Sequence, residues 1–141
     1  MFSIKLENNR IYVPCYAQDL FGVHLFIFDT GTLYTCCSNT CLSIKLSEED
    51  CEYFERLEIR GLDNEPIIYY KCVVTLFCVN NINMGNRDIW VTFDKRVNAA
   101  VLGFDILKDI SFLFDDQTGY MHFFESRNEL SRYVKNDEGG E

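Results

Sequence analysis

The chain has little proline and few basic residues, and it lacks long apolar runs. It contains 141 residues, of which 2 are Pro, 13 are Lys or Arg and 22 are Asp or Glu. Its longest apolar stretches, such as 25–28, are a few residues long, whereas a membrane-spanning helix needs about 20. The net charge of −9 argues against nucleic-acid binding, which rests on clustered Lys and Arg. We therefore expect neither a nucleic-acid nor a membrane partner.

A secretion signal and a paired-cysteine pattern are also missing. The N-terminus has no basic region followed by an apolar one, so we predict no signal peptide and a cytoplasmic location. The 7 cysteines are odd in number and include adjacent residues, which is not the pattern of a disulfide framework. There is no Cys-x2-Cys pair, although Cys36, Cys37 and Cys41 lie close together. We expect reduced, buried thiols with no cofactor and no metal; a metal- or redox-sensing role for these three cysteines is the alternative.

What the sequence does have is a series of short segments in which apolar and polar residues alternate. Apolar residues make up 48% of the chain and aromatic residues 15%, too many for a disordered acidic chain. Alternation in segments such as 2–6 and 11–16, with turn residues between them, is typical of strands. We predict one mostly-β domain over residues 1–124, followed by a polar extension, 125–141, that is partly helical or disordered.

Two local signals are more specific than the alternation. The segment 111–124 predicts a hairpin, because two apolar stretches flank the turn Asp-Asp-Gln-Thr-Gly. Ser47 is followed by three acidic residues, which suit the start of a helix, since Ser can cap it and the acids face the positive end of its dipole. This pattern predicts a helix that runs from Ser47 to about Arg56.

The segment with the most chemical content is 26–32, Phe-Ile-Phe-Asp-Thr-Gly-Thr. An apolar strand leads directly into Asp29, Thr32 can donate a hydrogen bond to its carboxylate, and Gly31 lets the backbone approach closely. A second segment, 99–107, reads as an apolar strand, a glycine and a short helix. The alternative for Asp29 is an ordinary turn residue, since Asp, Thr and Gly are common in turns.

In this order and at this separation, the two segments resemble the retropepsin-like aspartic proteases, the single-lobe relatives of pepsin. The resemblance covers roughly residues 2–124. It implies the acid protease fold: a mostly-β, closed or partly open barrel with one or two short helices. It also implies that Asp29 is the catalytic carboxylate and that Thr30, Gly31 and Thr32 support it.

Peptide hydrolysis in this family needs two carboxyl groups. One acts as the general base on a water molecule, while the other, protonated, polarises the carbonyl of the substrate. The chain has a single Asp-Thr-Gly sequence, so the second carboxylate must come from another copy. The resemblance therefore implies an aspartic endopeptidase that is active as a homodimer. The alternative is a non-catalytic, dimeric peptide-binding module on the same fold.

The resemblance also implies a flap, a hairpin tipped near 61–66 that closes over an extended peptide. Extended peptides bind through backbone hydrogen bonds and alternating side-chain pockets. The expected flap and substrate-binding residues are Gly61, Leu62, Asp63, Ile67, Val101, Leu102 and Gly103. Their apolar members imply a preference for apolar residues beside the cleaved bond.

Two further features concern the substrate subsites and the dimer interface. Leu33 and Tyr34 stand where viral members of the family place acidic residues, so the subsite contacts known there are not carried over. The segment 1–6 is a candidate interface strand.

Overall fold

Strands make up most of the regular secondary structure, as the sequence predicts. The computed structural model of the protein describes residues 1–60 and 65–139. Within these residues it contains twelve strands, two α-helices and two 3-10 turns. The strands form two sheets, one of nine strands and one of three.

The nine-stranded sheet holds both segments singled out in the sequence. In spatial order its strands are β5 (Arg56–Arg60), β6 (Pro66–Val74), β9 (Arg87–Thr92), β4 (Cys36–Ser38), β10 (Ala100–Leu102), β3 (Gly22–Phe28), β2 (Tyr12–Ala17), β7 (Cys78–Val79) and β8 (Ile82–Asn83). The pairs β10–β3 and β4–β9 are parallel, whereas the others are antiparallel. Because β3 and β10 are parallel neighbours, the chain leaves both strands at the same edge of the sheet.

The main hydrophobic core lies against one face of this sheet. In β2 and β3, alternate side chains such as Val13, Cys15 and Phe26 are buried, while those between them are more exposed. Leu102 of β10 and Ile106 of α1 (Phe104–Leu107) complete the same core. The core therefore fixes the ends of β3 and β10 and the short helix that follows β10.

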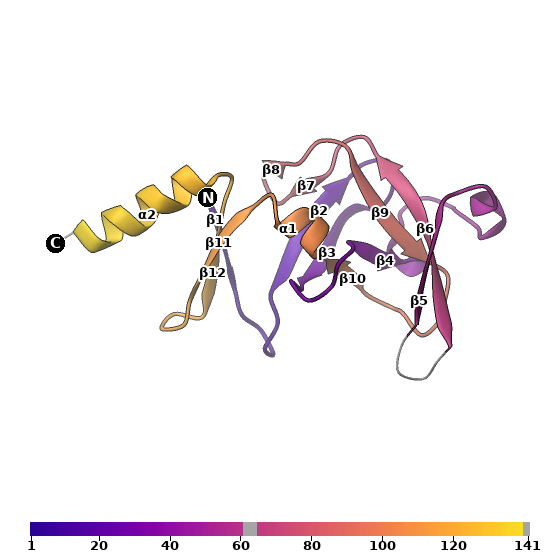
Figure 1. Cartoon of the computed structure of the whole chain (residues 1–141), viewed down its shortest axis with the longest axis horizontal. Coiled ribbons are helices and arrows are strands. Elements are labelled where there is room, and N and C mark those ends of the chain that lie inside the picture. The colour runs from indigo at the N-terminus through magenta and orange to yellow at the C-terminus, as the bar shows by residue number, and fades with distance from the viewer. Residues whose placement is uncertain (61–64, 140–141) are drawn as a thin grey trace.

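The three-stranded sheet consists of β1 (Phe2–Lys5), β12 (Tyr120–Phe124) and β11 (Ser111–Asp115), in that order. β11 and β12 form the hairpin that the sequence predicts. Within the polar extension, α2 (Arg127–Gly139) packs on this sheet, and the Tyr133 ring lies 5.3 Å from the rings of His122 and Phe124. This sheet and α2 lie at one end of the molecule and the β5–β6 hairpin at the other (Figure 1).

The helix predicted from Ser47 to Arg56 is wrong in extent. Ser47 and Asp50 do exchange the hydrogen bonds of a helix start, at 2.9 and 3.3 Å, but only the 3-10 turn η2 (Glu49–Cys51) follows. From Glu55 onward the chain pairs with β6 instead, beginning with the Lys71 N–H donating to the Glu55 carbonyl at 2.8 Å. Sheet pairing thus overrides the local helix signal.

The remaining helical elements are short. η1 (Asn39–Cys41) is a single 3-10 turn, and α1 has four residues. In residues 1–60 and 65–139, no helix combines the length and the apolar character that crossing a membrane requires.

Candidate active site

Asp29 lies directly after β3, on a loop that holds its carboxylate at the surface. Its own N–H donates to the Leu102 carbonyl of β10 at 3.1 Å, which extends the parallel pairing by one residue. The carboxylate accepts the Gly31 N–H at 2.9 Å and the Thr32 hydroxyl at 2.8 Å, one on each oxygen. Asp29 is exposed. The loop therefore orients an accessible carboxylate with hydrogen bonds from within itself.

Gly31 leaves little space beside this carboxylate. A Cβ at position 31 would lie 3.2 Å from Oδ1 of Asp29, which is tighter than an ordinary contact. Thr30, between them, is exposed. Asp29, Thr30 and Gly31 are thus exposed on this loop, and Gly31 and Thr32 both contact the Asp29 carboxylate.

The second sequence segment packs directly against this loop. The N–H groups at the start of α1 donate to the loop's carbonyls: Phe104 to Thr32 at 2.8 Å and Asp105 to Leu33 at 3.1 Å. Gly103 is buried where they meet, and a Cβ there would lie 2.6 Å from the backbone carbonyl of Tyr34. Backbone atoms cannot move aside easily, so this close approach requires glycine.

Thr35 joins the two segments, and sequence reasoning did not identify it. Its side chain is fully buried, and its hydroxyl donates to Oδ1 of Asp105 at 2.7 Å and accepts the Gly103 N–H at 2.9 Å. The Thr35 N–H donates to the same carboxylate oxygen at 2.9 Å. A hydroxyl residue directly before the adjacent cysteines of β4 is the signal that could have identified it. The Asp105 carboxylate therefore joins α1 to the segment that begins β4.

An apolar wall stands beside the loop on the face of the sheet opposite the main core. Cys36, Tyr69 and Trp90 form a second buried cluster, with Tyr34, Leu57, Ile67 and Val101 packed against it. The Tyr34 and Trp90 rings meet edge to face, 5.7 Å apart. Val101 pairs with both Cys36 and Ile27, so the wall continues to the strand that ends at Asp29.

This wall is electrically neutral at ordinary pH. Burial raises the pKa of the Cys36 thiol to about 11, and the nearby carboxylates of Asp105 and Asp29 contribute to that rise. Burial also raises the pKa of the Tyr69 hydroxyl to about 12. Both groups therefore stay protonated and present no charge to a ligand beside Asp29.

The expected substrate-binding residues fall into four groups. Ile67 and Val101 are partly buried in the wall beside the loop. Leu102, by contrast, is fully buried in the main core, where a peptide cannot reach it, so its expected contact with substrate is not supported. Gly103 supports the loop through its packing, and Gly61, Leu62 and Asp63 lie outside the described residues.

The hairpin expected to act as a flap is formed by β5 and β6. Ile59 of β5 pairs with Ile67 of β6, so the apolar wall continues out along the hairpin. The Arg96 side chain donates to the carbonyls of Glu65 and Pro66, at 3.3 and 3.2 Å, where β6 begins. Hydrogen bonds from Arg96 also hold the pKa of Asp94 down at about 2. Arg96 and Asp94 thus anchor the start of β6, at the tip end of the hairpin, to the loop before β10.

The cysteines show no arrangement for metal chemistry. All 7 lie within the described residues and are free thiols, and Cys78 is the partly exposed one while the others are buried. Across residues 1–60 and 65–139, no three His, Cys, Asp or Glu side chains are grouped so that they could hold a metal ion. Burial raises the pKa of Cys36, Cys37 and Cys41, which disfavours the thiolate that binds metals.

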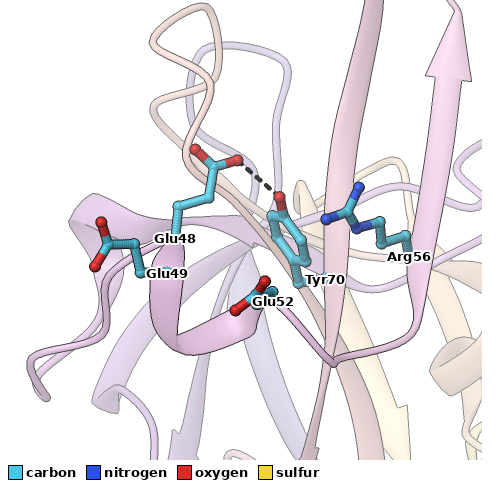
Figure 2. A pocket seen from close by; sticks show the side chains of 5 residues that line it. All are labelled: Glu48, Glu49, Glu52, Arg56 and Tyr70. Carbon is cyan, nitrogen blue, oxygen red and sulfur yellow. Dashed lines mark hydrogen bonds between the residues drawn. The ribbon is translucent and has the colours of Figure 1, made fainter.

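A hollow of about 540 Å³ lies on the face of the β5–β6 hairpin opposite the apolar wall. It is lined by Glu48, Glu49, Glu52, Arg56 and Tyr70. Figure 2 shows the Tyr70 ring between Glu48 and Arg56; its hydroxyl donates to Glu48 at 2.8 Å, and Arg56 lies 5.4 Å from the ring centre. Because adjacent strand residues point to opposite faces, Tyr70 faces this hollow while Tyr69 faces the wall beside Asp29. This hollow is therefore separate from the candidate site at Asp29.

Known proteins resemble this chain in structure and not in sequence. No protein-family model matches the sequence, and no curated protein sequence matches it. Among solved structures, a retropepsin-like aspartic protease from Rickettsia conorii has a similar fold, with a TM-score of 0.58 and 13% sequence identity. The match covers 85% of this chain and 86% of that chain. The chain therefore has the retropepsin-like acid protease fold, as the sequence predicts.

Proposed function

We propose that this protein is an aspartic endopeptidase and that it acts as a homodimer with one Asp29 from each copy. The observation that carries the proposal is the Asp29 loop itself. In a retropepsin-like fold, an exposed carboxylate follows β3 and is oriented by the Gly31 N–H and the Thr32 hydroxyl. The loop is in turn supported by α1, whose first N–H groups donate to the carbonyls of Thr32 and Leu33.

The chemistry requires the two carboxyl groups to lie close enough to share one proton. The ionised carboxylate takes a proton from a water molecule, which attacks the peptide carbonyl, while the protonated carboxyl donates a hydrogen bond to the carbonyl oxygen. Protonation of the amide nitrogen then lets the peptide bond break. Because one proton must be present and one absent, the rate should fall at both low and high pH.

The expected substrate is an extended peptide with apolar side chains beside the cleaved bond. Ile67 and Val101 give the wall beside Asp29 an apolar surface, and its buried thiol and hydroxyl groups are neutral. A charged side chain would lose hydration against this apolar wall without gaining a partner from it, which disfavours such a side chain.

The test is to incubate the protein with a mixed peptide library from mildly acidic to neutral pH. Cleavage by the wild type and its loss in Asp29→Asn would support the proposal. Asp116→Asn is the matched control, because it makes the same change at an exposed turn residue of the β11–β12 hairpin. Undiminished cleavage by Asp29→Asn contradicts the role of Asp29, and peptide binding without cleavage by the wild type would support the peptide-binding module instead.

A further inference from the structure

Two large apolar side chains beside Asp29 are exposed to solvent. Leu33, four residues after Asp29, is 60% exposed, and Phe104, the first residue of α1, is 48% exposed. Residues one or two positions further along turn inward: Tyr34 packs on the apolar wall, and Ile106 lies in the main core. The exposure of Leu33 and Phe104 is therefore not a general looseness of these segments.

Leu33 and Phe104 belong to the same rigid unit as Asp29. The Phe104 N–H donates to the Thr32 carbonyl at 2.8 Å, and Thr32 in turn donates to Asp29. The Leu33 carbonyl accepts the Asp105 N–H at 3.1 Å. The backbone from which the two side chains project therefore keeps a fixed position relative to the Asp29 loop.

We propose that Leu33 and Phe104 form an apolar contact with a second copy of this chain. The inference rests on the proposed function, which needs two Asp29 carboxylates within hydrogen-bond distance. Bringing them together makes the two Asp29 units face each other across a two-fold axis, so the same surface meets itself. Large apolar side chains on that surface are then removed from water in both copies. Each therefore contributes twice to the free energy of dimerisation.

The charges nearby fit an apolar contact. Asp29 is the one charged residue in the segment 29–35, and Asp105 is the one charged residue in 103–107, where it is bound by Thr35. These segments hold no cation that could form an ion pair between the copies. Each copy also carries a net charge of −9, so the copies repel each other at long range. Added salt should therefore tighten the dimer by screening this repulsion, whereas it would weaken a contact built on ion pairs.

The experiment measures the dimer dissociation constant by analytical ultracentrifugation. Leu33→Asp and Phe104→Asp should each raise it at least about a hundredfold, because each change acts twice across the axis. Val73→Asp is the matched control: Val73 is 61% exposed on β6, and we expect a change of less than about threefold. Phe104→Leu, which keeps an apolar side chain, should retain the dimer, and thermal unfolding of each variant establishes that it is folded.

The outcomes separate this inference from the proposed function. Folded Leu33→Asp and Phe104→Asp variants that dimerise like the wild type would overturn the inference, even if Asp29→Asn still abolishes cleavage. A rise in KM alone, with the dimer intact, would also overturn it, since the two side chains would then contact the substrate. If both variants become monomeric but the wild type cleaves no peptide, the inference stands and the proposed function falls. A wild type that stays monomeric at every concentration contradicts both.

Discussion

Two aspartates within the same site differ in what their surroundings do with a carboxylate. Asp29 accepts its two hydrogen bonds from residues two and three positions away, and it is exposed. Asp105 accepts its two from Thr35, which lies 70 positions away in the sequence, and it is partly buried. Asp29 is thus held by its own loop, whereas Asp105 holds two distant segments together.

This difference suits Asp29 to a reaction with substrate and Asp105 to stabilising the fold. A carboxylate that is to exchange protons with water and substrate must be accessible, and losing it should hardly disturb the fold. A carboxylate that bridges segments contributes through those bonds, and losing it leaves buried groups without partners. The variants below test this contrast through the free energy of unfolding, from the largest expected effect to the smallest.

Gly103→Ala should destabilise the protein most. The new Cβ would lie 2.6 Å from the Tyr34 carbonyl, so the backbone of the loop or of α1 must move. We expect a loss of about 3 kcal/mol or more, as for a severely overpacked site. Chemical denaturation monitored by circular dichroism measures it. Stability equal to that of the wild type would show that the two segments are not in tight contact.

Thr35→Val should come next. Valine has a similar shape but leaves the Gly103 N–H and the Asp105 carboxylate without the hydroxyl. Losing hydrogen bonds at such buried groups should lower the free energy of unfolding by about 2–3 kcal/mol. Thr35→Ser is the control, since it keeps the hydroxyl, and it should retain most of the stability. Equal effects of the two changes would show that packing, rather than the hydrogen bonds, fixes Thr35.

Asp105→Ala should cost about 2 kcal/mol, because it removes the acceptor for the Thr35 N–H and hydroxyl while part of the site can take up water. Peptidase activity should fall only to the extent that the Asp29 loop loses its support. The measurement pairs denaturation with cleavage at a temperature where the variant is folded. A complete loss of activity in a folded, dimeric variant would mean that Asp105 takes part in the chemistry itself.

Asp29→Asn should have the smallest effect on stability, within about 0.5 kcal/mol, because the residue is exposed and asparagine keeps one acceptor oxygen. The same denaturation experiment applies. A large change in either direction would place Asp29 among the structural carboxylates and remove the contrast with Asp105.

Much of the fold follows from sequence periodicity. Alternating apolar residues predict strands such as β2 and β3, and the turn at Asp115–Gly119 predicts the β11–β12 hairpin. The helix expected after Ser47 failed because a local capping signal does not show that the next residues pair with a distant strand. Local patterns identify strands and turns, whereas pairing over long sequence distances decides between competing local signals.

In the site, too, local sequence reveals contacts between neighbouring residues but not those between distant ones. The Asp29 loop is a continuous segment, so its composition alone suggests the bond from Thr32, whereas the bond from the Gly31 N–H was not predicted. Thr35 was missed because its partners, Gly103 and Asp105, are far away in the sequence. Gly103 itself was expected to contact substrate, although its packing against the loop explains it.

The most direct test of the central claim, that each active site uses one Asp29 from each copy, is a mixing experiment. Wild type and Asp29→Asn are combined in varying ratios at constant total concentration, allowed to exchange subunits, and assayed for peptide cleavage. If both carboxylates are needed, activity follows the square of the wild-type fraction, so an equal mixture retains about one quarter of the full activity. A linear decline, with about one half retained, would mean that each chain acts alone and would contradict the account.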